Sequence, residues 1–221
     1  MNGEPKRVVL INGSPKLTEK TTSGQLASMQ EARMKAAGLD VYRVDVRKSM
    51  SKGEPQADFE AMLEADALVF TFPLYIFCLP GILMRFLQDY VQFRSQRADR
   101  TRPARVYAVV NCGFPEADIN EEAVRVIWSF SRKIDAFFRF GVLIGGGSMI
   151  IAAKDAPCMK KPTAKLLGAF ELMVEDILTG GQAPLEASSI QANFPRRLYF
   201  FMAHRDWFAT ARKNGLKKKD L

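Results

Sequence analysis

The chain has 221 residues, of which 48% are hydrophobic and 25% charged, a composition typical of a soluble globular protein with its own core. Lysine and arginine outnumber aspartate and glutamate, 32 to 24, so the formal net charge is +8. The three cysteines, Cys78, Cys112 and Cys158, are far apart and form no CxxC, which argues against a disulfide framework, a zinc ribbon or an iron–sulfur centre. We therefore expect reduced thiols and no bound metal.

The chain starts with a strand, a polar turn and a helix, in that order. Residues 8–11 are apolar and indicate a buried strand, which ends at the turn Asn12-Gly13-Ser14-Pro15. A loop rich in hydroxyl groups and lysines follows, and a helix is predicted at residues 23–37. The first N–H groups of a helix have no intrahelical partner and favour negative charge. This stretch predicts a phosphate-binding loop, although a hydroxyl-rich surface loop has the same composition. It contains neither GxxxxGK[ST] nor GxGxxG, so neither a nucleoside-triphosphatase loop nor a dinucleotide fingerprint is supported.

The following elements alternate between strand and helix. Apolar and polar side chains alternate at residues 42–46, which predicts a half-exposed strand. Residues 48–58 are polar and predict a loop, and residues 59–65 predict a short helix. Residues 67–72 are almost continuously apolar, as in a central parallel strand that is covered on both faces. Pro80 then suits the first position of a helix that carries an apolar stripe.

The second half of the chain continues the alternation. A strand is predicted at residues 106–110, a turn at 111–116 and a helix at 120–138. A fifth strand, at residues 142–144, ends in three glycines, and a further helix is predicted at residues 163–179.

Basic residues gather in two places. Five arginines lie between Arg94 and Arg105, and the segment from Phe194 to Lys219 mixes arginine and lysine with aromatic residues. Such runs are usually solvated, and attraction of anionic ligands is the alternative. We expect residues 186–221 to form a helical extension that packs on the domain or on a dimer partner, in preference to a membrane-surface or nucleic-acid-binding element.

Five strands that alternate with helices predict an α/β fold with a doubly wound parallel sheet. Ligands of such sheets bind beyond the carboxyl ends of the strands. Three loops lie there, at residues 13–23, 73–80 and 111–116, and the glycines after the fifth strand form a fourth wall. One loop is rich in hydroxyl groups, one is apolar and aromatic, and the others contain glycine. Together they suit a phosphorylated ligand with a large planar ring.

Four pieces of sequence, in order, resemble the flavodoxin-like NAD(P)H-dependent FMN reductases: INGSPK with its Thr/Ser cluster, FPLYIFCLPGILMRFLQ, VVNCGFPE and IGGGSMI. The resemblance spans roughly residues 6–180. It implies a flavodoxin-like five-stranded parallel sheet in the order 2-1-3-4-5 within residues 1–185, with FMN as the cofactor and NADH or NADPH as the reductant. The family's commoner loop is GSPRxxGNS. Here Leu17-Thr18-Glu19-Lys20 stands where Gly-Asn is often found, so the hydroxyl that binds the phosphate stays open.

The resemblance also implies which residues would hold FMN. The phosphate would bind to Ser14, Lys16, Thr21, Thr22 and Ser23. The isoalloxazine would lie along Pro73, Leu74, Tyr75 and Ile76. The other side of the ring would meet Asn111, Cys112, Gly113 and Phe114, and close approach of the backbone would be allowed by Gly145, Gly146 and Gly147. Taken alone, Tyr75 and Phe77 suit core aromatics, and Cys112 suits an ordinary buried thiol.

The activity that the resemblance implies is an FMN-dependent oxidoreductase. It would pass hydride from NAD(P)H through flavin N5 to a small acceptor such as a quinone, a nitro or azo compound or free flavin. The cofactor carries this chemistry, so we expect no catalytic side chain. A flavodoxin-like electron carrier is one alternative, against which the net charge of +8 counts, and a non-catalytic FMN-binding module is another.

The resemblance further implies a homodimer. The N-terminal residues MNGEPKR show no apolar signal region, so we expect a cytoplasmic protein with no membrane span, and we expect no nucleic-acid partner.

Overall fold

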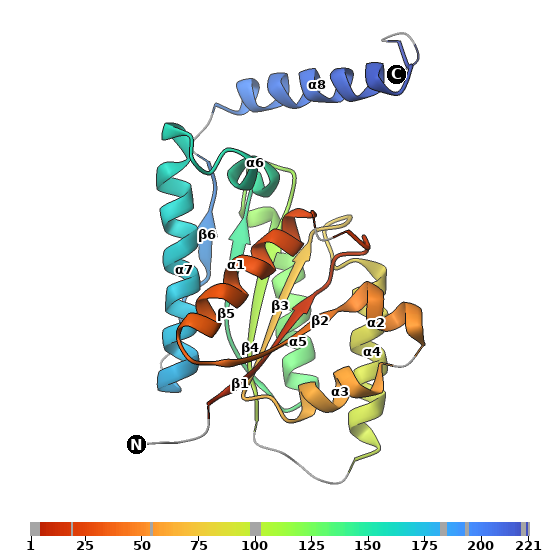
Figure 1. Ribbon diagram of the computed structural model, residues 1–221, viewed down its shortest axis with the longest axis vertical. Helices are drawn as coiled ribbons and strands as arrows, with labels where there is room; N and C mark the ends of the chain where they lie inside the picture. Colours follow the sequence, from red (N-terminus) through yellow and green to blue (C-terminus); the bar gives the residue numbers. More distant parts are fainter. Residues whose placement is uncertain are drawn as a thin grey trace.

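The computed structural model describes residues 5–18, 20–53, 55–97, 103–181, 185–192, 195–217 and 220. Within these residues, six parallel strands form one sheet in the order β2-β1-β3-β4-β5-β6 (Figure 1). The strands are β1 (Arg7–Asn12), β2 (Asp40–Asp45), β3 (Ala67–Pro73), β4 (Arg105–Asn111), β5 (Phe137–Ile144) and β6 (Ser188–Ile190). The predicted α/β class and the order 2-1-3-4-5 are confirmed, and β6 adds a short edge strand that the sequence did not predict.

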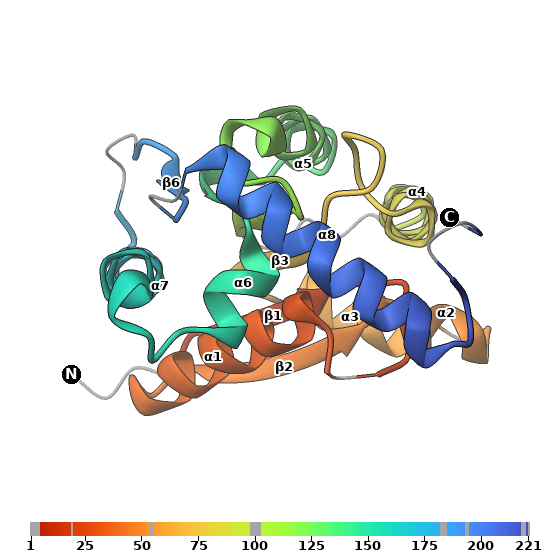
Figure 2. The ribbon, with the colours of Figure 1, turned by 90° about the horizontal axis from the view of Figure 1, so that it is seen from above.

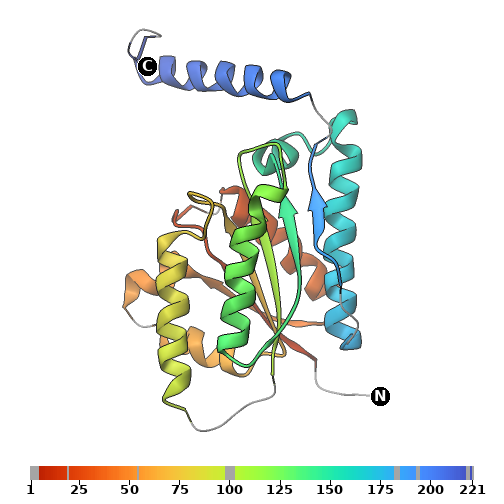
Figure 3. The ribbon, with the colours of Figure 1, turned by 180° about the vertical axis from the view of Figure 1, so that it is seen from behind.

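Helices cover both faces of the sheet. α1 and α7 pack on one face, and α4 and α5 pack on the other (Figures 1 and 3). The helices are α1 (Thr22–Ala36), α2 (Val46–Lys52), α3 (Gln56–Leu63), α4 (Gly81–Ser95), α5 (Glu121–Lys133), α6 (Gly147–Ala152), α7 (Lys160–Thr179) and α8 (Arg196–Lys213), with 3-10 turns at Asp118–Asn120 and Pro157–Met159.

The core lies in two layers because side chains of a strand alternate between the faces of the sheet. In β1, Val8 and Leu10 join the cluster beneath α1 and α7, whereas Val9 and Ile11 join the cluster beneath α4 and α5. The six residues of β3 before Pro73 are buried, as predicted for a central strand. Every strand pair in the sheet is parallel, so the carboxyl ends of the strands meet at one edge of the sheet.

Two predicted segments are wrong. The polar segment at residues 48–58 is not one loop, because α2 extends to Lys52 and α3 starts at Gln56. The helix predicted at residues 120–138 ends at Lys133. There Asp135 adopts a left-handed φ of 52°, which ends the helical path, and β5 starts at Phe137, earlier than the predicted strand.

The C-terminal segment forms α8, which lies above the carboxyl edge of the sheet and crosses it when seen from above (Figures 1 and 2). Phe194, the start of the predicted segment, lies outside the described residues. A domain boundary at residue 185 stays a prediction. Beyond that residue, β6 pairs with β5 and so belongs to the sheet. None of the helices in the described part of the chain combines the length and apolarity that a membrane crossing requires.

Candidate functional site

Asn111, at the end of β4, joins three of the four predicted walls at the carboxyl edge. Its amide nitrogen donates to the hydroxyl of Ser23 at 2.9 Å and to the carbonyl of Phe72 at 3.1 Å. The backbone carbonyl of Asn111 accepts a hydrogen bond from the backbone nitrogen of Leu74 at 2.8 Å. Asn111 and Ser23 are both buried. The first turn of α1, the end of β3 and the end of β4 are therefore held together as one unit.

The phosphate loop leads directly into α1, as predicted. Thr21 is the N-cap of this 15-residue helix, and its hydroxyl oxygen accepts from the backbone nitrogen of Gly24 at 3.0 Å. Because a threonine hydroxyl also has one hydrogen to donate, the cap leaves Thr21 able to bind an anion. The backbone N–H groups of Thr22 and Ser23 have no partner within the helix. Lys16 is exposed at the same loop and adds a positive charge.

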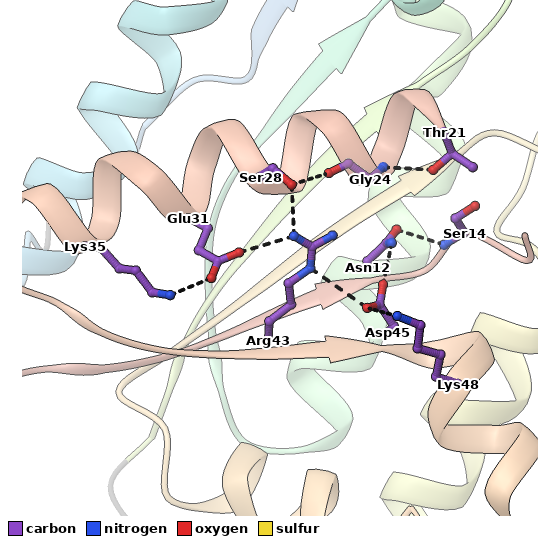
Figure 4. A network of polar contacts seen from close by, with 10 residues as sticks. All are labelled: Asn12, Ser14, Thr21, Gly24, Ser28, Glu31, Lys35, Arg43, Asp45 and Lys48. Carbon is purple, nitrogen blue, oxygen red and sulfur yellow. Dashed lines mark hydrogen bonds and ion pairs between the residues drawn. The ribbon is translucent and has the colours of Figure 1, made fainter. Parts of the chain in front are cut away.

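A network that the sequence did not single out fixes the start of this loop (Figure 4). The side-chain oxygen of Asn12 accepts from the backbone nitrogen of Ser14 at 3.2 Å, and its amide nitrogen donates to Asp45 at 2.7 Å. Asp45 lies 3.7 Å from the ammonium of Lys48 and 4.0 Å from Nε of Arg43. The two cations offset the carboxylate, so an acidic group supports the loop without making it repel phosphate.

The loop after β3 makes a tight turn in which Tyr75 and Cys78 pair through two backbone hydrogen bonds. At its tip Ile76 and Phe77 have φ values of 49° and 58°, a left-handed conformation that is costly for side chains such as these. Strained non-glycine residues of this kind cluster at functional sites. Ile76, predicted to lie along a flavin ring, is 95% exposed at the tip.

Aromatic side chains from the loops after β3 and β4 are exposed to solvent. Tyr75, Phe77 and Phe114 are 43%, 59% and 42% exposed, which excludes the interpretation of Tyr75 and Phe77 as core aromatics. The rings of Phe77 and Phe114 stack with a centroid distance of 6.3 Å and an interplanar angle of 15°. Large apolar side chains gathered at a surface indicate a place where another molecule binds.

The remaining predicted residues form the backbone wall between β4 and β5. Burial raises the pKa of the Cys112 thiol, which donates weakly to the Phe114 carbonyl, so the thiol stays protonated and unreactive. A Cβ atom added to Gly145 would lie only 2.2 Å from the Pro115 carbonyl oxygen. One added to Gly147 would lie 3.0 Å from Cβ of Asn111. These glycines let the two loops approach each other, and their contact with a cofactor stays a prediction.

The chemistry of this edge fits FMN. Hydroxyl donors, a lysine and a helix N-terminus lie at the α1 end, and exposed aromatic side chains lie at the ends of β3 and β4. A phosphate suits the first group and a planar heteroaromatic ring suits the second. Ser23 and Asn111 bond to each other, so the contribution of their side chains is to hold the walls in place; direct contacts of the predicted residues with FMN stay predictions.

Residues 6–140 match a protein family that is described by its flavodoxin-like fold. The chain belongs to this flavodoxin-like family. The match covers the strands from β1 to β4 and the start of β5, and therefore three of the four walls described above. No curated protein matches the flavodoxin-like chain in sequence.

Solved structures share the fold of the flavodoxin-like chain at low sequence identity. The NAD(P)H:quinone oxidoreductase of Methanothermobacter marburgensis has a TM-score of 0.58 and 15% identity, over 82% of this chain and 100% of that one. General stress protein 14 of Treponema denticola, solved in complex with FMN, has a TM-score of 0.55 and 14% identity, over 78% and 99%. The flavodoxin of Streptococcus pneumoniae has a TM-score of 0.52 and 15% identity, over 79% and 99%. At these identities the likeness shows the fold alone.

Proposed function

We propose that this chain binds FMN at the carboxyl edge of its sheet and is an NAD(P)H-dependent oxidoreductase. One observation carries the proposal: Asn111 joins the N-terminus of α1, with its hydroxyl groups, to loops that present exposed aromatic rings. FMN has a phosphate at one end and a planar ring at the other, so it matches both ends of this edge. The Treponema denticola structure holds FMN, and the Methanothermobacter marburgensis protein is named an NAD(P)H:quinone oxidoreductase, which supports the same assignment.

In this proposal the phosphate binds to the Thr21 hydroxyl hydrogen, to the backbone N–H groups of Thr22 and Ser23, and to the charge of Lys16, with Ser14 beside them. Hydrogen bonds to a charged group contribute about 1.5–3 kcal/mol each, so this end supplies much of the affinity. Thr21 is the residue that we favour among the hydroxyl donors, because its cap fixes the oxygen and leaves the hydrogen free to turn outwards.

The ring end is formed by Pro73, Leu74, Tyr75 and Phe114, with the glycine backbone of the β4 and β5 loops opposite. Bound FMN would supply the chemistry of hydride and electron transfer between a nicotinamide and an acceptor. The protein contributes binding, orientation and exclusion of water, and backbone N–H groups near Gly113 favour a negatively charged ring. No acid or base side chain is needed for these tasks, and the neutral thiol of Cys112 takes no part in them.

An electron carrier is the second candidate, since the Streptococcus pneumoniae flavodoxin has the same fold. The net charge of +8 favours the enzyme, because such carriers are typically acidic. A non-catalytic FMN-binding module is the third. A small-molecule acceptor such as a quinone, a cytoplasmic location and a homodimer belong to the leading proposal and rest on the family resemblance.

The test begins with the purified protein and its visible spectrum after addition of FMN. NADH and NADPH are then added without oxygen. We expect a yellow protein whose absorbance bleaches within seconds with at least one of the two. A yellow protein that neither nucleotide bleaches would favour a carrier or a binding module. A protein that takes up no FMN would overturn the cofactor assignment.

A further inference from the structure

α8 is tied to the same backbone that forms the wall of the proposed FMN site. The hydroxyl of Tyr199 donates to the Gly113 carbonyl at 2.5 Å, and Nε of Arg196 lies 2.8 Å from a carboxylate oxygen of Glu116. Tyr199 is itself buried, and a Cβ atom added to Gly146 would lie 3.5 Å from its ring. The first turns of α8 are therefore anchored above the β4 and β5 loops, and the rest of the helix crosses the carboxyl edge (Figure 2).

A groove of about 370 Å³ separates α8 from α6. Met149 and Ala152 line it from α6, and Met202 and Ala203 line it from α8. Asp206 is the one charged side chain among its described lining residues. Because α6 starts at Gly147, the groove opens next to the glycines that close the proposed FMN site.

We propose that this groove, roofed by α8, binds the electron acceptor, and that it selects apolar acceptors that are neutral or positively charged. The inference rests on the proposed function, to which it adds the place and the chemistry of the second substrate. Thioether and methyl groups offer apolar surface, and methionine adapts to ligands of different shape. The carboxylate of Asp206 repels an anionic acceptor even when that acceptor has the same size as a neutral one.

The position of the groove explains how α8 would act. The groove borders the glycine wall at Gly146: a Cβ atom added there would lie 3.5 Å from the ring of Tyr199 and 3.9 Å from Cε of Met149, and both side chains line the groove. The contact of Tyr199 with Gly113 sets the height of the roof above this wall. α8 is therefore a positioning and specificity element, and its removal would open the site to bulkier or anionic acceptors.

The test compares two alanines of α8 in the FMN-loaded protein. Ala203→Phe fills the groove, whereas Ala209→Phe places the same ring at an exposed position on the helix that does not line it. The probe is 2-methyl-1,4-naphthoquinone, whose Kd is measured by calorimetry without reductant and whose KM is measured with it. We expect Ala203→Phe to raise both by about tenfold, the effect of losing burial of about two methylene-sized groups. Ala209→Phe should leave both unchanged, and neither variant should alter the Kd of FMN or the bleaching by NAD(P)H.

Asp206→Asn supplies a second variant that keeps the shape of the helix. The affinity for 1,4-naphthoquinone-2-sulfonate, an anion, should rise about threefold at low salt, while that for the neutral quinone stays constant. Equal Kd values for the wild type, Ala203→Phe and Ala209→Phe would overturn the inference and leave the proposed function standing. If the protein binds no FMN, the proposed function fails, and the calorimetric comparison on the protein without FMN still decides whether the groove binds the quinone.

Discussion

Replacement of Asn111 by alanine tests whether one buried amide joins the walls of the site. The substitution removes the hydrogen bonds to the Ser23 hydroxyl and to the Phe72 carbonyl, at 2.9 and 3.1 Å. Each bond contributes about 1 kcal/mol net, so the free energy of unfolding should fall by about 2 kcal/mol. The substitution also removes the link that Asn111 makes between the first turn of α1 and the end of β3. We therefore expect the Kd of FMN to rise at least about tenfold, which corresponds to about 1.4 kcal/mol.

Gln30 offers a matched control. Its amide nitrogen is also buried and donates to the Leu26 carbonyl at 3.2 Å and to the Thr71 hydroxyl at 2.9 Å, so it too ties α1 to β3. It lies seven residues beyond Ser23, about 10 Å further along α1 from the site. Gln30→Ala should cost a similar free energy of unfolding and leave the Kd of FMN within about twofold of the wild type.

Unfolding is measured in urea without FMN, because bound ligand would itself add to the stability. The Kd of FMN is measured by quenching of flavin fluorescence. If Asn111→Ala loses stability as Gln30→Ala does but binds FMN as tightly as the wild type, Asn111 is an ordinary core amide and the reasoning is refuted.

Three further predictions concern the helix cap, the glycine wall and a buried ion pair. Thr21→Ala removes the helix cap, so it should lower the free energy of unfolding by about 1 kcal/mol and weaken FMN binding. Thr21→Asp should keep the cap but still weaken FMN binding, because its carboxylate repels the phosphate. Urea unfolding and FMN titration separate the two effects, and unchanged FMN binding in both variants would exclude Thr21 as a phosphate ligand. Gly145→Ala should disrupt the wall because the new Cβ would meet the Pro115 carbonyl oxygen at 2.2 Å, so thermal unfolding should show a loss of several degrees, and an unchanged Tm would contradict the close approach. Burial alone would raise the pKa of Asp176, but hydrogen bonds from Arg139 and Tyr107 outweigh it and lower the pKa. The stability from this carboxylate is thus complete above its unfolded pKa of about 3.9 and is lost as the pH falls below that value. Measured by urea unfolding from pH 6 to 3, the free energy of unfolding should fall less steeply for Asp176→Asn than for the wild type. An equal fall in both proteins would refute the link between this ion pair and acid stability.

The layers of the fold could be predicted because long apolar runs have few alternatives to a buried strand. Residues 8–11 and 67–72 are all buried, as expected. The errors lie where composition and periodicity disagree with packing. Composition alone predicts a loop from residue 48, yet α2 continues to Lys52 and buries Ser49 within that stretch. β6 has three residues, too few to show any periodicity.

The loops of the site could be predicted from the rule that ligands bind beyond the carboxyl ends of parallel strands. The partners of individual side chains could not, because they depend on strand register. Asn12 meets Asp45 since the two residues stand opposite each other in the pairing of β1 with β2. The contact of Tyr199 with Gly113 joins residues that are 86 positions apart in the chain, and no local sequence pattern predicts such a contact.

The comparison of FMN with riboflavin tests the central claim most directly, because the two differ by the phosphate alone. Both are titrated into the protein without cofactor, and binding is followed by flavin fluorescence. If the phosphate lies at the N-terminus of α1, FMN should bind at least about a hundredfold more tightly, which corresponds to about 2.7 kcal/mol from charge-assisted hydrogen bonds. Equal affinity for the two, or no binding of either, would contradict the account.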